Sequence, residues 1–226
     1  MAECGNSRSD RPPARVTWVF DLDNTLHNAS PHIFPHISRG MTAYLQEHLQ
    51  LTEEDAGRLR VHYWRSYGAT LLGMMRHHGT DPEHFLRETH AFPNLSGMML
   101  YERGLAAMLR RLPGRKLVLS NAPRQYASAV LQVMGIDGHF DALHCIESTG
   151  YQPKPSLAAF HSLLRTHGLI AARCVMVEDS RENLRPAKRL GMKTVWVTRE
   201  PRAPGYVDVK TASVLALPRL LARLGL

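Results

Sequence analysis

The sequence predicts an α/β fold in which a mostly parallel sheet is flanked by helices and is interrupted by an inserted helical segment. Short apolar runs alternate with helix-like stretches, and this alternation is typical of parallel strands joined by right-handed crossovers. A chain of 226 residues with 44% hydrophobic residues can bury the core that such a fold needs. The proposed strands cover residues 16–20, 116–119, 142–146, 174–177 and 194–197.

Helix-like stretches between these strands stop at glycine. Residues 123–134 are followed by Gly135, residues 155–167 by Gly168 and residues 183–190 by Gly191. Glycine readily takes the left-handed conformation that closes many helices. We therefore predict three crossover helices over these ranges.

The alternation stops between residues 27 and 99, where long amphipathic stretches predict helices over 33–49, 52–66, 67–77 and 82–90. We expect residues 27–99 to form a helical domain inserted into a core made of residues 16–26 and 100–226. Residues 1–15 contain arginines and prolines but no apolar run, so we predict a flexible leader and not a secretory signal.

Two carboxylates, Asp21 and Asp23, follow the first predicted strand directly. Side chains alternate faces along a strand, but a chain that curls as it leaves the sheet can turn both carboxylates toward one crevice. Carboxylate and carbonyl oxygens suit Mg²⁺, which usually keeps several waters that substrate phosphate can replace. We predict that the Asp21 carboxylate and the Asp23 carbonyl oxygen form part of a magnesium site.

Polar residues also follow other predicted strands. Ser120 and Asn121 follow one strand and Glu178 and Asp179 follow another, while Lys154 lies between two prolines just before a helix. Ligands in such sheets bind at the carboxyl ends of the strands, so these groups are expected at one edge. Together they are the parts that phosphoryl transfer needs.

In this order, Asp21-Leu22-Asp23-Asn24-Thr25, Ser120-Asn121, Lys154 and Glu178-Asp179 resemble the motifs of the haloacid dehalogenase superfamily of phosphohydrolases. The resemblance spans most of the chain and implies a Rossmann-like core with a helical cap. It implies that Asp21 attacks phosphorus to form an aspartyl-phosphate. Asp23 would protonate the leaving oxygen and then activate water.

The resemblance implies supporting roles for further residues. Lys154 would offset the negative charge on the phosphoryl oxygens. Ser120 and backbone N–H groups near Asn121 would donate hydrogen bonds to these oxygens. Asp179, with Glu178 directly or through water, would complete the magnesium shell that Asp21 and Asp23 begin. Thr25 would support the phosphate site, and Asn183 would steady the metal loop.

The segment between the first two motifs resembles the cap of this superfamily, which would exclude water and admit only small phosphomonoesters. Residues 20–26, 67–71 and 177–184 are similar to the pyrimidine 5'-nucleotidase branch, which implies a nucleoside monophosphate substrate. His27 departs from that branch, which commonly has an aromatic residue there. Tyr67 is a candidate to stack on the base, and packing within the cap is an equally weighted alternative.

Other functions fit parts of the sequence. A phosphatase or phosphomutase acting on small sugar phosphates would use the same motifs. A haloacid dehalogenase would share Asp21 but normally lacks the second acid, so Asp23 favours phosphorus chemistry. The net charge of +8 leaves a non-enzymatic binding or regulatory protein as an outside alternative.

Composition excludes several classes of protein. The basic residues are dispersed without interleaved aromatics, which argues against specific nucleic-acid binding. Cys4, Cys145 and Cys174 are odd in number and widely spaced, so we expect free thiols, and the histidines show no metal-ligand spacing. No apolar run approaches the roughly 18 residues of a membrane helix, so we expect no membrane contacts. Because the leader does not read as a secretory signal, we expect a cytoplasmic enzyme. No heptad pattern or repeat demands a partner, so monomer and homodimer both remain open.

Overall fold

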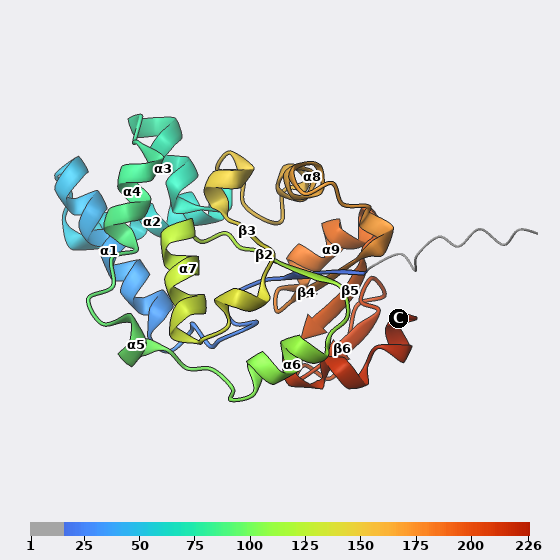
Figure 1. Ribbon diagram of the computed structural model, residues 1–226. Helices are drawn as coiled ribbons and strands as arrows, with labels where there is room; N and C mark the ends of the chain where they lie inside the picture. Colours follow the sequence, from blue (N-terminus) through green and yellow to red (C-terminus); the bar gives the residue numbers. More distant parts are fainter. Residues whose placement is uncertain (1–15) are drawn as a thin grey trace, which may run out of the picture.

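The computed structural model describes residues 16–226, so the predicted leader and Cys4 lie outside the described part. The predicted α/β class is confirmed, because the chain forms a parallel sheet with the order β3-β2-β1-β4-β5-β6 (Figure 1). The strands are β1 (Thr17–Phe20), β2 (Arg115–Leu119), β3 (Ala142–His144), β4 (Cys174–Glu178), β5 (Lys193–Val197) and β6 (Val209–Thr211).

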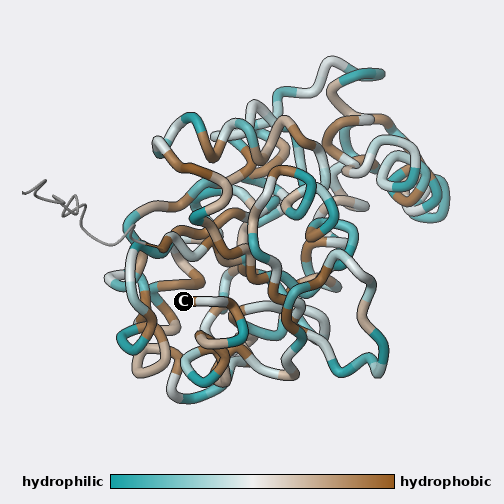
Figure 2. The backbone as a smooth tube through the Cα atoms, turned by 90° about the vertical axis from the view of Figure 1, so that its right-hand side faces the viewer, coloured by the Kyte–Doolittle hydropathy of each residue, from teal (hydrophilic) through white to brown (hydrophobic). Residues whose placement is uncertain are grey.

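The central strand β1 is buried on both faces, as its unbroken apolar sequence predicts. Trp18 and Phe20 point into one hydrophobic cluster, while Val19 points into the cluster on the opposite face. The tube view shows hydrophobic segments running through the middle of the molecule (Figure 2). Because β1 lies between β2 and β4, residues just after these three strands lie next to one another.

Helices cover both faces of the sheet. The cluster that contains Phe20 includes Leu109 and Tyr126 from two helices, whereas the cluster that contains Val19 includes Phe160 and Leu184 from two others. The predicted ends at Gly135, Gly168 and Gly191 all have positive φ. The core helices are α6 (Leu105–Arg111), α7 (Arg124–Val133), α8 (Leu157–Thr166) and α9 (Arg181–Arg189).

Four helices between β1 and β2 pack around their own hydrophobic cluster, which includes Leu45, Met74 and Phe85, and they gather at one end of the molecule (Figure 1). They are α1 (Ile33–Leu49), α2 (Glu53–Tyr67), α3 (Thr70–His78) and α4 (Pro82–Thr89). A fifth helix, α5 (Leu95–Met98), packs instead on the core through Leu95 and Met98. The predicted insertion reaches residue 99, so its last segment joins the core surface.

Several short elements differ from the sequence prediction. The predicted strand over 142–146 ends at His144, because a 3₁₀ turn starts at Ile146. Strand β6 and helix α6 have no counterpart in the prediction, since each is too short to show a clear hydrophobic period. The 3₁₀ turns are η1 (Asp137–His139), η2 (Ile146–Thr149), η3 (Ala171–Arg173), η4 (Val214–Arg219) and η5 (Ala222–Leu224).

Two sequence expectations concern the whole described chain. No helix within residues 16–226 has both the length and the apolar character needed to cross a bilayer. Cys145 and Cys174 are buried free thiols. Burial raises the pKa of both, to about 12 for Cys145 and about 11 for Cys174, so each packs as a small neutral side chain.

Candidate active site

The loop after β1 turns sharply and carries both predicted carboxylates to one pocket. Asp21 continues the strand and donates its backbone N–H to Val177 O of β4 at 2.9 Å. Asn24 then adopts a left-handed conformation with φ of 63°, which asparagine tolerates better than most residues. Its Oδ1 accepts from the backbone N–H of Ala29 at 2.9 Å and holds the turn. As a result Asp21 and Asp23 both line the pocket.

The two strands next to β1 deliver further motif residues. Ser120 follows β2 and Glu178 ends β4, and these strands flank β1 on either side. From β1 the chain first adds β2 and β3 on one side of the sheet and then crosses over to add β4, β5 and β6 on the other side. The strand order therefore reverses at β1. Crevices at such switch points are the usual ligand sites of α/β sheets.

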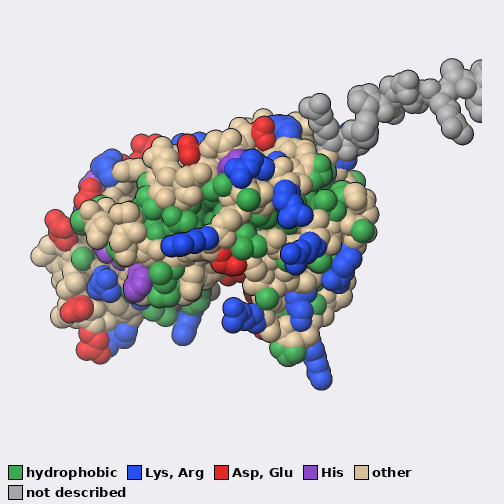
Figure 3. All heavy atoms as spheres, turned by 60° about the horizontal axis from the view of Figure 1, so that its bottom comes forward, with side chains coloured by type: hydrophobic (Ala, Val, Ile, Leu, Met, Phe, Trp, Pro, Cys, Tyr) green, Lys and Arg blue, Asp and Glu red, His purple; other side chains and the backbone are tan. Residues whose placement is uncertain are grey.

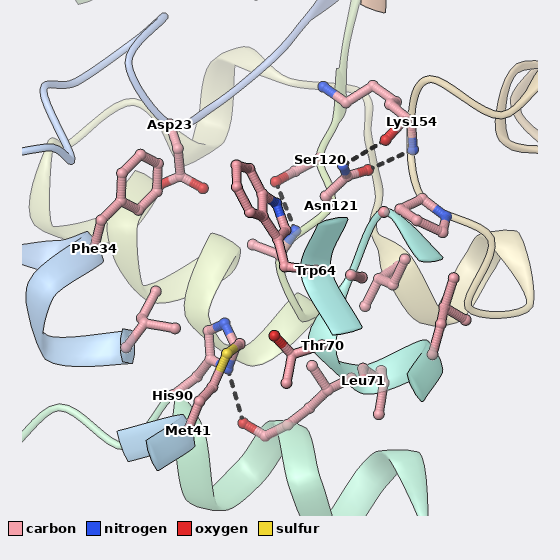
Figure 4. Close-up of a pocket in the computed structure, with 18 of the residues that line it drawn as sticks. Asp23, Phe34, Met41, Trp64, Thr70, Leu71, His90, Ser120, Asn121 and Lys154 are labelled. Carbon is pink, nitrogen blue, oxygen red and sulfur yellow. Dashed lines mark hydrogen bonds between the residues drawn. The ribbon is translucent and has the colours of Figure 1, made fainter. Parts of the chain in front are cut away.

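Lys154 reaches this edge from the loop before α8. Its Nζ donates to Asp21 Oδ1 at 2.6 Å and to Glu178 Oε2 at 2.8 Å. Asn121 holds the lysine loop in both directions, because its Oδ1 accepts from Lys154 N at 2.7 Å and its Nδ2 donates to Lys154 O at 3.0 Å (Figure 4). The structure therefore brings the predicted lysine to the predicted nucleophile, with Asn121 supporting the lysine.

Burial dominates the electrostatics of these groups. Burial and repulsion from Glu178 raise the pKa of Asp21 to about 7, although Lys154 opposes the shift. Burial likewise raises the pKa of Glu178 to about 7, with Lys154 again opposing. Burial alone would lower the pKa of Lys154, but attraction to Asp21 and Glu178 raises it above its ordinary value. One buried ammonium thus compensates two buried carboxylates only in part.

The uncompensated charge fits a cation. One carboxylate oxygen each from Asp21, Glu178 and Asp179 lies within 4.8 Å of the others. Burial, and then repulsion from Asp21, raise the pKa of Asp179 above its ordinary value. Oxygen donors of this kind suit a hard divalent cation. Within residues 16–226 no histidine joins this or another cluster of potential ligands.

Glu178 and Ser120 already have partners within the protein. Glu178 Oε1 accepts from the backbone N–H of Ser180 at 3.1 Å, while its other oxygen accepts from Lys154. Ser120 Oγ accepts from Ala122 N at 3.0 Å, which leaves its hydroxyl hydrogen able to donate into the pocket. Asn183 lies in α9 and lines the same pocket.

The pocket between the cap helices and the core has a volume of about 750 Å³, which is within the usual range for small-molecule sites. Phe34 from α1 and Trp64 from α2 line it with 40% and 59% of their surface exposed. Figure 4 shows both aromatic side chains among the residues that line the pocket with Asp23 and Ser120. Neither aromatic residue was identified from the sequence, although a tryptophan on the polar face of an amphipathic helix is a possible signal.

Two predicted contact residues do not line the pocket. The Tyr67 hydroxyl is bonded to His77 Nε2 of α3 at 2.6 Å, and the residue is not among those that line the pocket. The pocket-facing stripe of α2 contains Arg60 and Trp64, whereas Tyr67 lies with Tyr63 on the stripe that faces α3. Thr25, in the turn after β1, is buried, and its hydroxyl has no hydrogen-bond partner among the described residues.

His27 and Tyr126 contact Asp23, and neither was predicted to do so. The Tyr126 hydroxyl donates to Asp23 Oδ1 at 2.6 Å, and His27 Nε2 lies 2.9 Å from the same oxygen. Burial raises the pKa of Tyr126 and Asp23 raises it further, so its hydroxyl stays a donor. His27 lies only four positions after Asp23, but nothing in the sequence relates Tyr126 to this loop.

Figure 3 shows how the basic side chains lie on one face of the molecule. Lys and Arg side chains are spread over this face and are separated by hydrophobic and neutral atoms.

Comparisons with known proteins agree with this geometry. Residues 17–191 match the family model of the haloacid dehalogenase-like hydrolases. Phosphate metabolism protein 8 of Saccharomyces cerevisiae is 23% identical over 200 residues, which cover 81% of this chain but only 61% of the yeast protein. A phosphoglycolate phosphatase of Colwellia psychrerythraea is 24% identical over 80% of this chain and 83% of its own.

A solved phosphatase structure from Thermococcus onnurineus has the same fold, with a TM-score of 0.67 and 18% identity. The match covers 91% of this chain and 97% of the other. The agreement therefore includes the cap helices as well as the sheet.

Proposed function

Since this chain belongs to the haloacid dehalogenase-like hydrolases, we propose that it hydrolyses small phosphomonoesters through a phosphorylated Asp21, with Mg²⁺ as cofactor. One observation carries the proposal: Lys154 Nζ lies 2.6 Å from Asp21 Oδ1 in a pocket that Asp23 and Ser120 also line. A nucleophile, a second acid, a cation and a hydroxyl donor thus share one crevice.

The proposed reaction has two displacements. In the first, an Asp21 carboxylate oxygen attacks phosphorus, the bond from phosphorus to the ester oxygen breaks, and Asp23 gives its proton to the departing alcohol. In the second, Asp23 takes a proton from water, the water oxygen attacks phosphorus, and the bond to Asp21 breaks to release phosphate. Two steps replace one difficult displacement.

The remaining groups handle negative charge. Lys154 favours the ionised form of Asp21 and would offset charge on the phosphoryl oxygens, and the Ser120 hydroxyl would donate to one of them. When bound, Mg²⁺ would be held by Asp21, Asp179 and the Asp23 carbonyl oxygen and would offset charge on the phosphoryl group. Glu178 orients Lys154, and Asn183 supports the metal loop.

The cap side of the pocket favours a substrate with an aromatic group. Phe34 and Trp64 leave large apolar surfaces exposed, and such surfaces inside a pocket indicate a ligand that covers them. A nucleoside monophosphate presents a flat base at one end and a phosphate at the other. We therefore propose a nucleoside monophosphate, with a pyrimidine base preferred, and α1–α4 as the lid that closes over it.

Phosphoglycolate is the second candidate, because the Colwellia psychrerythraea relative is a phosphoglycolate phosphatase. Its carboxylate would need a cationic partner beyond the phosphate site. Arg60 and Arg65 of α2 line the pocket and are available for that contact. A nucleoside monophosphate would place its leaving group against Phe34 and Trp64, whereas phosphoglycolate would place its leaving group against the two arginines.

Phosphate release with Mg²⁺ tests the reaction. The wild-type protein should release phosphate from a panel of UMP, CMP, phosphoglycolate and sugar phosphates, and chelation with EDTA should stop it. Asp21→Asn should lower turnover by at least about a thousandfold, because it removes the nucleophile. Asp137→Asn, a matched change at an exposed position, should leave turnover unchanged. Full activity of Asp21→Asn would refute the mechanism, and conversion of a sugar phosphate to its isomer would identify a mutase.

Trp64→Ala tests the substrate class. Loss of one stacking contact should raise the KM for UMP about tenfold while the kcat/KM for phosphoglycolate stays within about twofold. Tyr101→Ala removes another exposed aromatic ring, outside the pocket, and is the control. Equal losses on both substrates, or no turnover of UMP by the wild type, would remove the nucleotidase assignment but not the hydrolase.

A further inference from the structure

The Asp23 carboxyl group is held through one of its two oxygens. Oδ1 accepts from the Tyr126 hydroxyl at 2.6 Å and lies 2.9 Å from His27 Nε2, while Tyr126 and His27 lie 3.4 Å from each other. Among residues 16–226, no group is bonded to Oδ2. Within the protein, Oδ1 is therefore occupied by two hydrogen-bond partners, whereas Oδ2 is available to a substrate.

Neither of the two partners can touch a substrate. His27 and Tyr126 are buried, and both are outside the set of residues that line the pocket, whereas Asp23 lines it. They stand behind Asp23 as seen from the pocket. Any effect they have on the reaction must act through the position of the Asp23 carboxyl group.

His27 is held by the loop that carries Asp23. The turn at Asn24 brings the backbone of residue 27 back to form a bridge with residue 23. His27 Nδ1 is buried without a partner in the described part of the chain. Because Nδ1 has no acceptor, the geometry assigns the ring hydrogen to Nε2, which donates it to Asp23.

Tyr126 is held from a different element. It lies in the first turn of α7, and its ring packs against Phe92 at 5.2 Å and His90 at 5.9 Å between ring centroids. Its hydroxyl thus reaches Asp23 from a ring with little freedom to move. Two donors on separate elements restrict both the rotation and the translation of the carboxyl group.

We propose that Tyr126 and His27 are positioning residues that bind Oδ1 of Asp23 and thereby direct Oδ2, which carries the transferable proton, toward the ester oxygen of the substrate. This inference rests on the proposed phosphohydrolase function. Oδ1 accepts both hydrogen bonds whether Oδ2 is protonated or not, so the carboxyl group keeps one orientation as an acid in the first step and as a base in the second.

The dependence of the rate on the leaving group distinguishes positioning from a structural role. 4-Nitrophenyl phosphate releases a stable phenolate and needs little help from an acid, whereas 4-nitrobenzyl phosphate releases an alkoxide that must be protonated. The two esters differ by one methylene group, so they should fit the same pocket. The ratio of their kcat/KM values reports the step in which the leaving group departs, and it is independent of the folded fraction.

Tyr126→Phe should lower the kcat/KM for 4-nitrobenzyl phosphate about tenfold and that for 4-nitrophenyl phosphate less than about twofold. His27→Leu should change the ratio in the same direction, and His27→Gln, which keeps an N–H donor, should restore most of it. Asp23→Ala should give the largest change in the ratio. Tyr44→Phe is the matched control, because it removes another buried tyrosine hydroxyl that is bonded to a histidine, His84, away from the pocket.

An unchanged ratio in both Tyr126→Phe and His27→Leu, alongside a changed ratio in Asp23→Ala, would overturn the positioning role and leave the proposed function intact. A wild-type protein that releases phosphate neither from these esters nor from UMP, CMP, phosphoglycolate or sugar phosphates would instead refute the proposed function, and this inference with it.

Discussion

Lys154 is an ammonium ion with only 4% of its surface exposed, and such a charge is stable only when it is paired. Asp21 and Glu178 both accept hydrogen bonds from it. In return, the ammonium favours the ionised form of the nucleophile, whose pKa burial raises to about 7. The lysine is therefore required for the state of Asp21 as well as for the charge on a phosphoryl group.

His144 is a buried residue next to the site whose ionisation opposes folding. It is 1% exposed, its Nδ1 lies 3.3 Å from His167 Nε2, and its Nε2 has no partner in the described part of the chain. Burial, then His167 and Arg124, lower its pKa to about 4. The unfolded chain, with a histidine pKa of about 6.5, therefore binds a proton first as the pH falls.

We expect stability to fall with decreasing pH through this residue. The loss begins near pH 6.5 and ends near pH 4, and between pH 7 and pH 5 it should lower the free energy of unfolding by about 2 kcal/mol. Urea unfolding of His144→Leu should show a pH dependence that is smaller by this amount. The control is His161→Leu on the exposed face of α8, which should keep the wild-type dependence. If the free energy of unfolding had the same pH dependence in the wild type, His144→Leu and His161→Leu, His144 would not be the source of the loss.

At the scale of elements, the position of Trp64 in the pocket depends on how α2 packs against α3. Two hydroxyl-to-imidazole bonds join these helices, Tyr63 to His78 at 2.7 Å and Tyr67 to His77 at 2.6 Å. Gly73 permits the close approach, because a Cβ atom there would lie 2.2 Å from Tyr63 Cγ. Trp64 is on the other side of α2 and is thereby directed toward the core.

Substitution of this glycine should separate the two helices. Gly73→Ala should destabilise the protein by about 1 to 3 kcal/mol, because the added methyl group overlaps the Tyr63 ring. The comparison is Gly57→Ala within α2, where a Cβ atom would meet nothing within 4 Å, and that change should stabilise the helix by about 0.5 to 1 kcal/mol. Urea unfolding measures both, and the same sign for the two variants would contradict this packing argument.

At the scale of the molecule, a basic chain surrounds an acidic centre. The net charge of +8 favours the approach of phosphorylated anions, while the buried carboxylates at the edge of the sheet favour a divalent cation. Burial raises the pKa of Asp21 and Glu178 to about 7, so without a cation these groups oppose folding increasingly as the pH rises from about 4 to about 7. Cation binding and folding should therefore be coupled.

Mg²⁺ should raise the melting temperature. At one hundred times its dissociation constant, a ligand of the folded state adds about 2.7 kcal/mol, which corresponds to roughly 5 to 10 °C for a chain of this size. The shift should be smaller at pH 5.5 than at pH 7.5, because protons compete for the carboxylates. Asp179→Asn should lose the shift and Asp137→Asn should keep it. A full shift in Asp179→Asn would place the cation elsewhere.

Sequence reasoning predicted the parts of this protein that depend on local order. The apolar strand 16–20 and the polar residues after three strands predicted both the sheet and the edge at which Asp21, Ser120 and Glu178 meet. This was possible because the carboxyl ends of parallel strands share one edge, so order along the chain determines position in space. Helix ends at glycine followed for the same local reason.

The tertiary structure alone decided which side chains face each other across elements. The contact of Tyr126 with Asp23 joins residues 103 positions apart, and the choice of Trp64 over Tyr67 as a pocket residue depends on the rotation of α2 against α3. Helix rotation and the approach of distant elements are set by the packing of the whole molecule. Hydrophobic periodicity identifies the buried side of a helix, but it does not identify the partner that covers it.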